Sequence, residues 1–141
     1  MKYFFDTSVL VAAISVDHVH HATSQAAYLS AAKNHSSCAA HSLAELYATL
    51  TRFPGKRRMS GEQALLSVEE TRTRLTTVTL EESEYWSVIN DSAREGIIGG
   101  TIYDALIARC ALKVKATTIY TWNLAHFRRL GGEIAKRVQT P

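Results

Sequence analysis

The sequence predicts an α/β protein whose central, mainly parallel sheet is covered by helices on both faces. Three observations support this prediction. Short apolar runs of strand length alternate with longer helical segments along the 141 residues. The strand candidates are near-continuous apolar or β-branched runs, as expected for strands that are buried on both faces. Helix stop and start signals separate the segments, and strands that alternate with helices form parallel sheets.

The first half of the chain contains two predicted strands. Residues 2–5 form an apolar run that is typical of a buried strand. Pro54-Gly55 is a stop signal for the helix before it. Ser60 is followed three residues later by Gln63, a capping-box pattern that opens the next helix. The predicted elements are strands at 2–5 and 36–40 and helices at 7–15, 20–33, 43–52 and 61–72.

The second half continues the alternation. Residues 75–80 are rich in threonine and aliphatic side chains, which favours a strand. Gly96 stops the following helix, and Gly99-Gly100 breaks the chain before the next one. The predicted elements are strands at 75–80 and 117–122, helices at 82–95 and 102–114, and a last edge strand at 134–138.

Length and composition indicate a single domain over residues 1–141. Hydrophobic residues make up 46% and charged residues 21%, and no apolar run approaches the roughly 18 residues of a membrane span. An acidic residue at position 6 interrupts any signal-peptide core. Cys38 and Cys110 lie in apolar contexts without metal-ligand spacing, which favours buried thiols in a reducing cytoplasm. The net charge of +3 is compatible with an anionic partner.

Three acidic residues stand alone in apolar surroundings: Asp6, Glu45 and Asp104. A carboxylate in such a run costs stability unless it is paired, hydrogen-bonded or bound to a cation. Each of the three falls where a strand ends or a helix begins, and these ends share the ligand-binding edge of a parallel sheet. Asn123, just beyond a predicted strand, reaches the same edge. We therefore expect four oxygen-bearing side chains in one cleft, a set that suits Mg²⁺ or Mn²⁺.

Helix capping is the alternative role for the same acids. Ser42 followed by Glu45 is itself a capping-box pattern, and Thr101 followed by Asp104 is close to one. Asp6 is suited to cap a helix that begins at the next residue. The two roles are compatible, because the helix dipole keeps a carboxylate near a helix N-terminus ionised.

Four segments of the sequence, each with one of the four oxygen-bearing side chains, stand out together: residues 5–10 (FDTSVL), 42–46 (SLAEL), 102–108 (IYDALIA) and 120–127 (YTWNLAHF). Together they resemble the PIN domain, and in particular the single-domain VapC toxins of bacterial VapBC toxin–antitoxin pairs. The resemblance covers residues 2 to about 138. It implies a three-layer α/β/α fold, usually dimeric, and a metal-dependent endoribonuclease that is inhibited by a VapB-like antitoxin made from the same operon.

By the same resemblance, Asp6, Glu45 and Asp104 are similar to the three main acids of the family. Many members carry a fourth acid where this chain has Asn123, whose amide can still ligate a metal ion or position water. We expect Asp6 and Asp104 to be direct ligands of Mg²⁺ or Mn²⁺, and Glu45 to be a ligand or a base acting through water. Three hydroxyl groups are expected either to hydrogen-bond these carboxylates or only to form caps and turns: those of Thr7, Ser8 and Thr121.

Basic and aromatic side chains suggest a path for RNA. The aromatic residues Trp122 and Tyr103 flank the predicted cleft and are able to stack on bases. A solvated basic face, with Trp122 in the core, is the alternative. His18, His20 and His21 show no metal spacing and read as a polar loop or helix start. The basic residues fall in two groups, one of Arg52, Lys56, Arg57 and Arg58 and the other of Arg128, Arg129, Lys136 and Arg137.

Two other functions are compatible with the sequence. One is a phosphatase or phosphotransferase with Asp6 as an aspartyl nucleophile, although Ser8 stands where the familiar pattern has a second aspartate. The other is a binding module for RNA or protein that has lost its metal, which the neutral Asn123 makes conceivable. RNA cleavage that depends on metal distinguishes the three.

Overall fold

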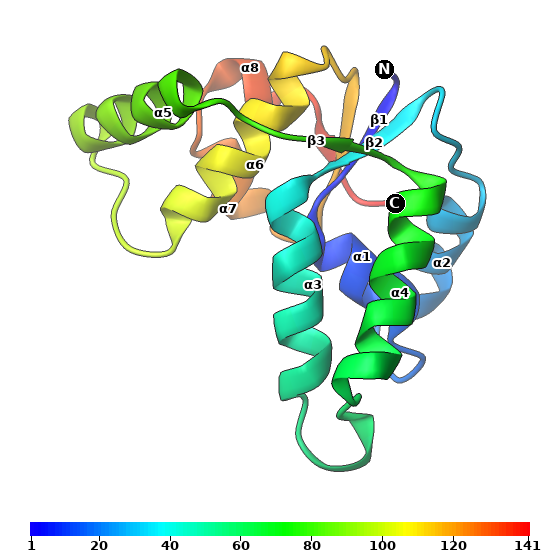
Figure 1. The fold of residues 1–141 in the computed structure, drawn as a ribbon. Helices are drawn as coiled ribbons and strands as arrows, with labels where there is room; N and C mark the ends of the chain where they lie inside the picture. The colour runs from blue at the N-terminus through cyan, green and yellow to red at the C-terminus, as the bar shows by residue number, and fades with distance from the viewer.

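Five parallel strands form the centre of the molecule, in the order β3-β2-β1-β4-β5, in a computed structural model that describes residues 1–141 (Figure 1). Residue Phe5 pairs with Cys38 on one side and with Tyr120 on the other. Because every pairing is parallel, all strands end at the same edge of the sheet. The strands are β1 (Tyr3–Phe5), β2 (Ser36–Ala39), β3 (Thr76–Val78), β4 (Thr118–Tyr120) and β5 (Val138–Gln139).

Eight helices cover the two faces of this sheet, so the predicted α/β class with a central parallel sheet is confirmed. Figure 1 shows α1 to α4 on one side and α5 to α8 on the other, with α3 and α4 extending as a long hairpin. The helices are α1 (Thr7–Ile14), α2 (His21–Leu29), α3 (Ala40–Arg52), α4 (Gly61–Arg74), α5 (Glu82–Glu95), α6 (Thr101–Lys113), α7 (Leu124–Arg128) and α8 (Gly132–Ala135), with a short 3-10 turn at Gly55–Arg57.

Two separate hydrophobic cores lie on the two faces. Successive side chains of a strand point to opposite faces, so Phe4 joins one core and Phe5 the other. The Phe4 core contains Ile107 of α6 and Phe127 of α7. The Phe5 core contains side chains of α1 and α3, including Leu50. The central strand β1 is therefore the partition between two packed layers.

Several predicted boundaries are wrong. The helix predicted at 20–33 ends at Leu29, because the amides of His35 and Ser36 both bond to the carbonyl of Ala32 in a turn that leads into β2. The helix predicted at 43–52 begins at Ala40. The edge strand predicted at 134–138 starts too early: residues 134 and 135 belong to helix α8, residues 136 and 137 form a turn, and the edge strand β5 begins only at Val138.

Some of the predicted helix caps and stops are confirmed and one is wrong. Ser60 and Gln63 form the predicted capping box, with reciprocal bonds of 3.2 and 2.9 Å. Gly96 ends α5 in the left-handed conformation (φ 71°) that glycine adopts readily. The capping box predicted at Ser42 is absent, since α3 starts before it and the buried Ser42 Oγ has no hydrogen-bond partner.

No helix combines the length and the apolar character needed to cross a bilayer. Both cysteines are free and buried, as expected. Burial raises the pKa of Cys38 to about 12 and that of Cys110 to about 11, which makes both thiols unreactive at neutral pH.

Replacing Leu50 by alanine is expected to lower the free energy of unfolding by about 2–5 kcal/mol, because its fully buried side chain would leave a cavity in the Phe5 core. Leu66, which is 67% exposed on α4, is the matched control, and Leu66→Ala should change stability by less than about 0.5 kcal/mol. Urea unfolding of both variants measures the difference. Equal losses would mean that the Phe5 core does not hold α3 in place.

Candidate active site

A cleft of about 320 Å³ opens at the carboxyl edge of the sheet, beyond the ends of β1 and β4. It is lined by all four predicted oxygen-bearing side chains: Asp6, Glu45, Asp104 and Asn123. Asp6 and Glu45 belong to the α1 and α3 side of the sheet, and Asp104 and Asn123 to the α6 and α7 side. The cleft therefore lies across the seam between the two layers.

Asp6 is the most buried of the four, with 1% of its surface exposed. It is the N-cap of α1, and its Oδ2 accepts hydrogen bonds from the Ser8 hydroxyl (2.7 Å), the Thr121 hydroxyl (2.8 Å) and the Ser8 amide (3.4 Å). The backbone amide of Thr7 also favours the ionised form. Burial nevertheless raises the pKa of Asp6 above its ordinary value, and the hydrogen bonds only partly oppose this. A cation in the cleft would offset that cost of burial.

Glu45 lies in the second turn of α3, not in the first turn as predicted, because α3 begins at Ala40. The Thr7 hydroxyl donates a 3.0 Å hydrogen bond to its Oε1. His41, one turn earlier, places Nε2 3.6 Å from the same oxygen. All three predicted hydroxyls, those of Thr7, Ser8 and Thr121, thus bond to a carboxylate of the cleft.

Asp104 lies in the first turn of α6, as predicted, but makes no capping bond there. Burial, followed by the charges of Asp6 and Glu45, raises the pKa of Asp104 to about 6. The exposed His126 ring, with Nδ1 3.8 Å from Oδ2, acts in the opposite direction. Burial is the larger cause, and the negative charges of the other two carboxylates add to it.

Asn123 is the N-cap residue of α7, yet its side chain makes no capping hydrogen bond. Its backbone amide donates to the Thr121 hydroxyl at 3.0 Å, which fixes the loop after β4. The amide group of Asn123 remains available to the cleft. Of the four residues, only Asp6 acts as a helix cap through its side chain.

The residues of the cleft fit a hard divalent cation. No lysine or arginine lines it, so the three carboxylates lack a neighbouring permanent positive charge. Carboxylate and amide oxygens are the ligands of Mg²⁺ and Mn²⁺. The structure groups no three His, Cys, Asp or Glu side chains closely enough to hold a metal ion by themselves. A bound ion would need water ligands as well, and Mg²⁺ usually keeps several.

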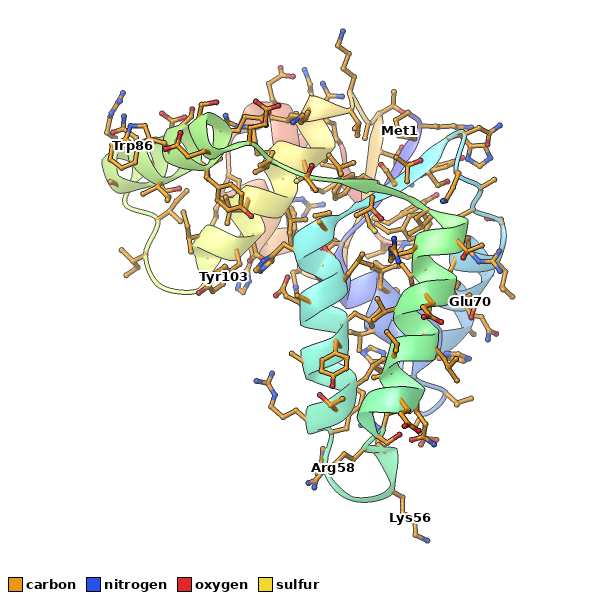
Figure 2. The ribbon with its side chains drawn as sticks, viewed as in Figure 1. Met1, Lys56, Arg58, Glu70, Trp86 and Tyr103 are labelled. Carbon is orange, nitrogen blue, oxygen red and sulfur yellow. The ribbon has the colours of Figure 1, made fainter.

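The aromatic residues predicted to flank the cleft differ in their positions. Trp122 lines the cleft, but its ring stacks on His20 with centroids 3.6 Å apart. Tyr103 is 48% exposed and stacks on His41, outside the cleft lining (Figure 2). His18, for which the sequence predicts a polar loop or helix start, also lines the cleft.

Three residues of the first basic group, Lys56, Arg57 and Arg58, line a second cavity that lies next to the acidic cleft. Residues 14–17 line this cavity, whereas His18 lines the cleft, so one short segment separates the two. Lys56, Arg57 and Arg58 line its other side, and Figure 2 shows Lys56 and Arg58 at the tip of the α3–α4 hairpin. Arg52, at the end of α3, is exposed and outside the lining of both cavities.

The second basic group is partly committed to internal contacts. Lys136 and Arg137 both pair with Glu133 of α8. Arg128 and Arg129 at the end of α7 are exposed and make no ion pair. Only these two of the second group are therefore free to meet an external anion.

Comparison with known proteins agrees with the fold. Three solved structures resemble it, each over most of both chains. VapC20 of Mycobacterium tuberculosis, a toxin that cleaves the sarcin-ricin loop, is 18% identical with a TM-score of 0.71, over 86% of this chain and 90% of that one. VapBC2 of Rickettsia felis, bound to a DNA fragment from its promoter, is 19% identical with a TM-score of 0.65, over 99% and 98%. VapBC-1 of nontypeable Haemophilus influenzae is 20% identical with a TM-score of 0.66, also over 99% and 98%.

At these identities the structural likeness establishes the fold. Comparison with curated protein sequences returned no significant match. The family comparison is independent of both, and it matches the PIN domain to residues 3–133, a span that includes the whole acidic cleft. The chain therefore belongs to the PIN-domain family.

Proposed function

We propose that this protein is a Mg²⁺- or Mn²⁺-dependent endoribonuclease and the toxin of a VapBC-type toxin–antitoxin pair. The observation that carries the proposal is the acidic cleft itself. Three carboxylates face one space with no lysine or arginine beside them, and one of them has a pKa of about 6. Membership of the PIN family and the VapC fold of the structural relatives support a nuclease of this kind.

Each residue has a separate task in the proposed reaction. Asp6 and Asp104 would hold the ion, and Glu45 would either ligate it or accept a proton from the attacking water. A bound Mg²⁺ or Mn²⁺ lowers the pKa of water and neutralises charge on the phosphate. The Thr7 and Ser8 hydroxyls keep the Glu45 and Asp6 carboxylates oriented, as their hydrogen bonds indicate.

Thr121, just after β4, supports the site, since its hydroxyl donates to Asp6 and accepts a bond from the backbone amide of Asn123, which lines the cleft. The Asn123 amide would position water or complete the ligand set. Phosphates of a bound RNA strand would contact the basic residues around the second cavity. The exposed arginines at the ends of α3 and α7 would bind further phosphates of the same strand. The proposed RNA-binding residues are Arg52, Lys56, Arg57, Arg58, Arg128 and Arg129.

The alternative of an aspartyl nucleophile has weaker support. Asp6 is 1% exposed, and its Oδ2 already accepts three hydrogen bonds. A phosphoryl group on Asp6 would add negative charge to a cleft that has no lysine or arginine. Metal-dependent hydrolysis of RNA uses the same residues and needs no covalent attack by Asp6.

Asp104→Asn should reduce RNA cleavage in Mg²⁺ or Mn²⁺ at least a hundredfold, because removing one carboxylate charge weakens ion binding while the helix is preserved. The matched control is Asp91→Asn on α5, where the carboxylate pairs with Arg109 away from the cleft. Cleavage of a labelled RNA by the three proteins, with and without EDTA, is the measurement. Equal rates for wild type and Asp104→Asn would contradict the proposed site.

Ion binding should also depend on pH through Asp104, whose pKa is about 6. Mn²⁺ binds the ionised carboxylate, so its affinity should be roughly tenfold higher at pH 7 than at pH 5. In the metal-free protein, Asp104 has the opposite effect on folding stability, which should fall as the pH rises. The folded pKa lies above the ordinary 3.8, so the contribution to stability is complete below about pH 4 and is lost as the pH rises through 6.

Titration calorimetry with Mn²⁺ at pH 5, 6 and 7 measures the first effect, and thermal melts of the metal-free protein over pH 4–7 measure the second. Asp104→Asn is the control for both, since it lacks the titrating group. A wild-type Mn²⁺ affinity that is the same at pH 5 and 7 would show that Asp104 does not contact the ion.

The proposed partner is a VapB-like antitoxin, because two of the structural relatives are VapBC complexes. A basic side chain of the antitoxin would enter the acidic cleft and neutralise the carboxylates. We also propose a homodimer, since α5 exposes Trp86 (65%) and Ile89 (46%), and Figure 2 shows Trp86 at the outer end of the molecule.

Expression of the wild-type chain alone should slow growth, and co-expression with the small protein encoded beside it should restore growth and yield a co-purifying complex. Asp104→Asn, expressed to the same level, should not slow growth but should still bind the partner. Harmless expression of a soluble, RNA-cleaving wild type that binds no adjacent gene product would refute the toxin–antitoxin assignment.

A further inference from the structure

The segment between α1 and α2 forms one wall of the acidic cleft and holds two histidines, His18 and His20, and a third, His21, begins α2. His20 stacks on Trp122, with ring planes 6° apart, and the Trp122 indole N–H donates to Ser24 at 2.8 Å. His21 Nδ1 lies 2.9 Å from the carbonyl oxygen of Ala12. Two of the three rings thus anchor the segment to its surroundings. The third, that of His18, lines the cleft together with the carboxylates.

This wall is connected to the acids through hydrogen bonds. The backbone amide of Trp122 donates to the Ser8 hydroxyl at 2.9 Å, and the same hydroxyl donates to Asp6 at 2.7 Å. The His20–Trp122 stack therefore rests on the residues that orient Asp6. Consequently His18 has a defined position relative to the predicted ion site.

The backbone sets the proton position on His18. Its Nδ1 accepts a 3.0 Å hydrogen bond from the amide of His20, so the proton of the neutral ring is on Nε2. A ring in this state cannot ligate a metal ion through Nε2 without losing that proton. Burial, then the neighbouring His20, Arg57 and His21, lower the pKa of His18 below its ordinary value, which favours the neutral ring. In this form His18 is an N–H donor without charge.

We infer that His18 binds the RNA substrate, with its Nε2–H donating a hydrogen bond to a phosphate oxygen of the strand that enters the cleft. This inference rests on the proposed nuclease function and adds a substrate-binding residue to it. A neutral donor suits the place, because it attracts phosphate without repelling a divalent cation nearby. Beyond His18 the same segment borders the cavity lined by Lys56, Arg57 and Arg58, so a strand crossing His18 reaches those cations.

Two substitutions separate the donor from the fold of the loop. In His18→Asn, the side-chain oxygen can accept the His20 amide bond in an Asx turn, but the donor at the Nε2 position is lost. In His18→Gln, the amide nitrogen reaches the Nε2 position and restores the donor. His35→Asn is the matched control, because His35 precedes β2 at the opposite edge of the sheet.

The measurements are kcat and KM for cleavage of a labelled RNA in Mn²⁺, RNA binding in Ca²⁺, Mn²⁺ affinity and thermal melting. His18→Asn should raise KM and weaken RNA binding by roughly tenfold, with kcat changed less than about threefold, as expected for loss of one hydrogen bond to a charged group. His18→Gln should lie within about threefold of wild type, and His35→Asn should equal it. Mn²⁺ affinity should be the same in all four proteins, and the melting temperature of His18→Asn should equal that of the wild type.

Three outcomes would overturn the inference while leaving the nuclease proposal intact: wild-type KM in His18→Asn, equal losses in His18→Asn and His18→Gln, or a loss of Mn²⁺ affinity in His18→Asn. The last would make His18 a metal ligand. If the wild type neither cleaves nor binds RNA, the proposed function fails and the inference fails with it. Cleavage by the wild type that Asp104→Asn abolishes distinguishes the two cases.

Discussion

The hydrogen bonds to the buried carboxylate of Asp6 are the interaction on which the rest of the site depends. At 1% exposure, an unpartnered carboxylate would be strongly destabilising. Its partners come from two distant parts of the sequence: Ser8 lies in α1, and Thr121 lies just after β4. Ser8 then accepts the amide of Trp122, and Thr121 accepts the amide of Asn123. One acid thus joins the central strand, the first helix and the loop that shapes the opposite wall.

The convergence of the acids was accessible from the sequence because it depends on topology. Alternating strands and helices imply a parallel sheet, and parallel strands end at one edge. The start of α3 was not accessible, because Ser42 and Glu45 imitate a capping box and no signal marks Ala40. The buried Ser42 hydroxyl has no hydrogen-bond partner in the structure, so the capping box that the Ser42–Glu45 spacing predicts does not form. Glu45 therefore lies one turn deeper in its helix than predicted.

The remaining features required tertiary packing. Helices α7 and α8 have five and four residues, too few for a hydrophobic period to be recognised. The contacts of His41 and His126 with the acids were also missed, although His41 lies four residues before Glu45, at helical spacing. Nothing in the sequence relates the loop of His18 to the cleft, since that contact arises only when α1 and α2 pack against Trp122.

The division of the interior into two cores has a mechanical consequence for the cleft. Asp6 and Glu45 are attached to helices that pack in the Phe5 core, whereas Asp104 and Asn123 are attached to helices that pack in the Phe4 core. An ion held by donors from both groups would act as a noncovalent cross-link between two independently packed layers. Its loss would remove one link between the two layers, which strand β1 and the hydrogen bonds of Asp6 would still hold together.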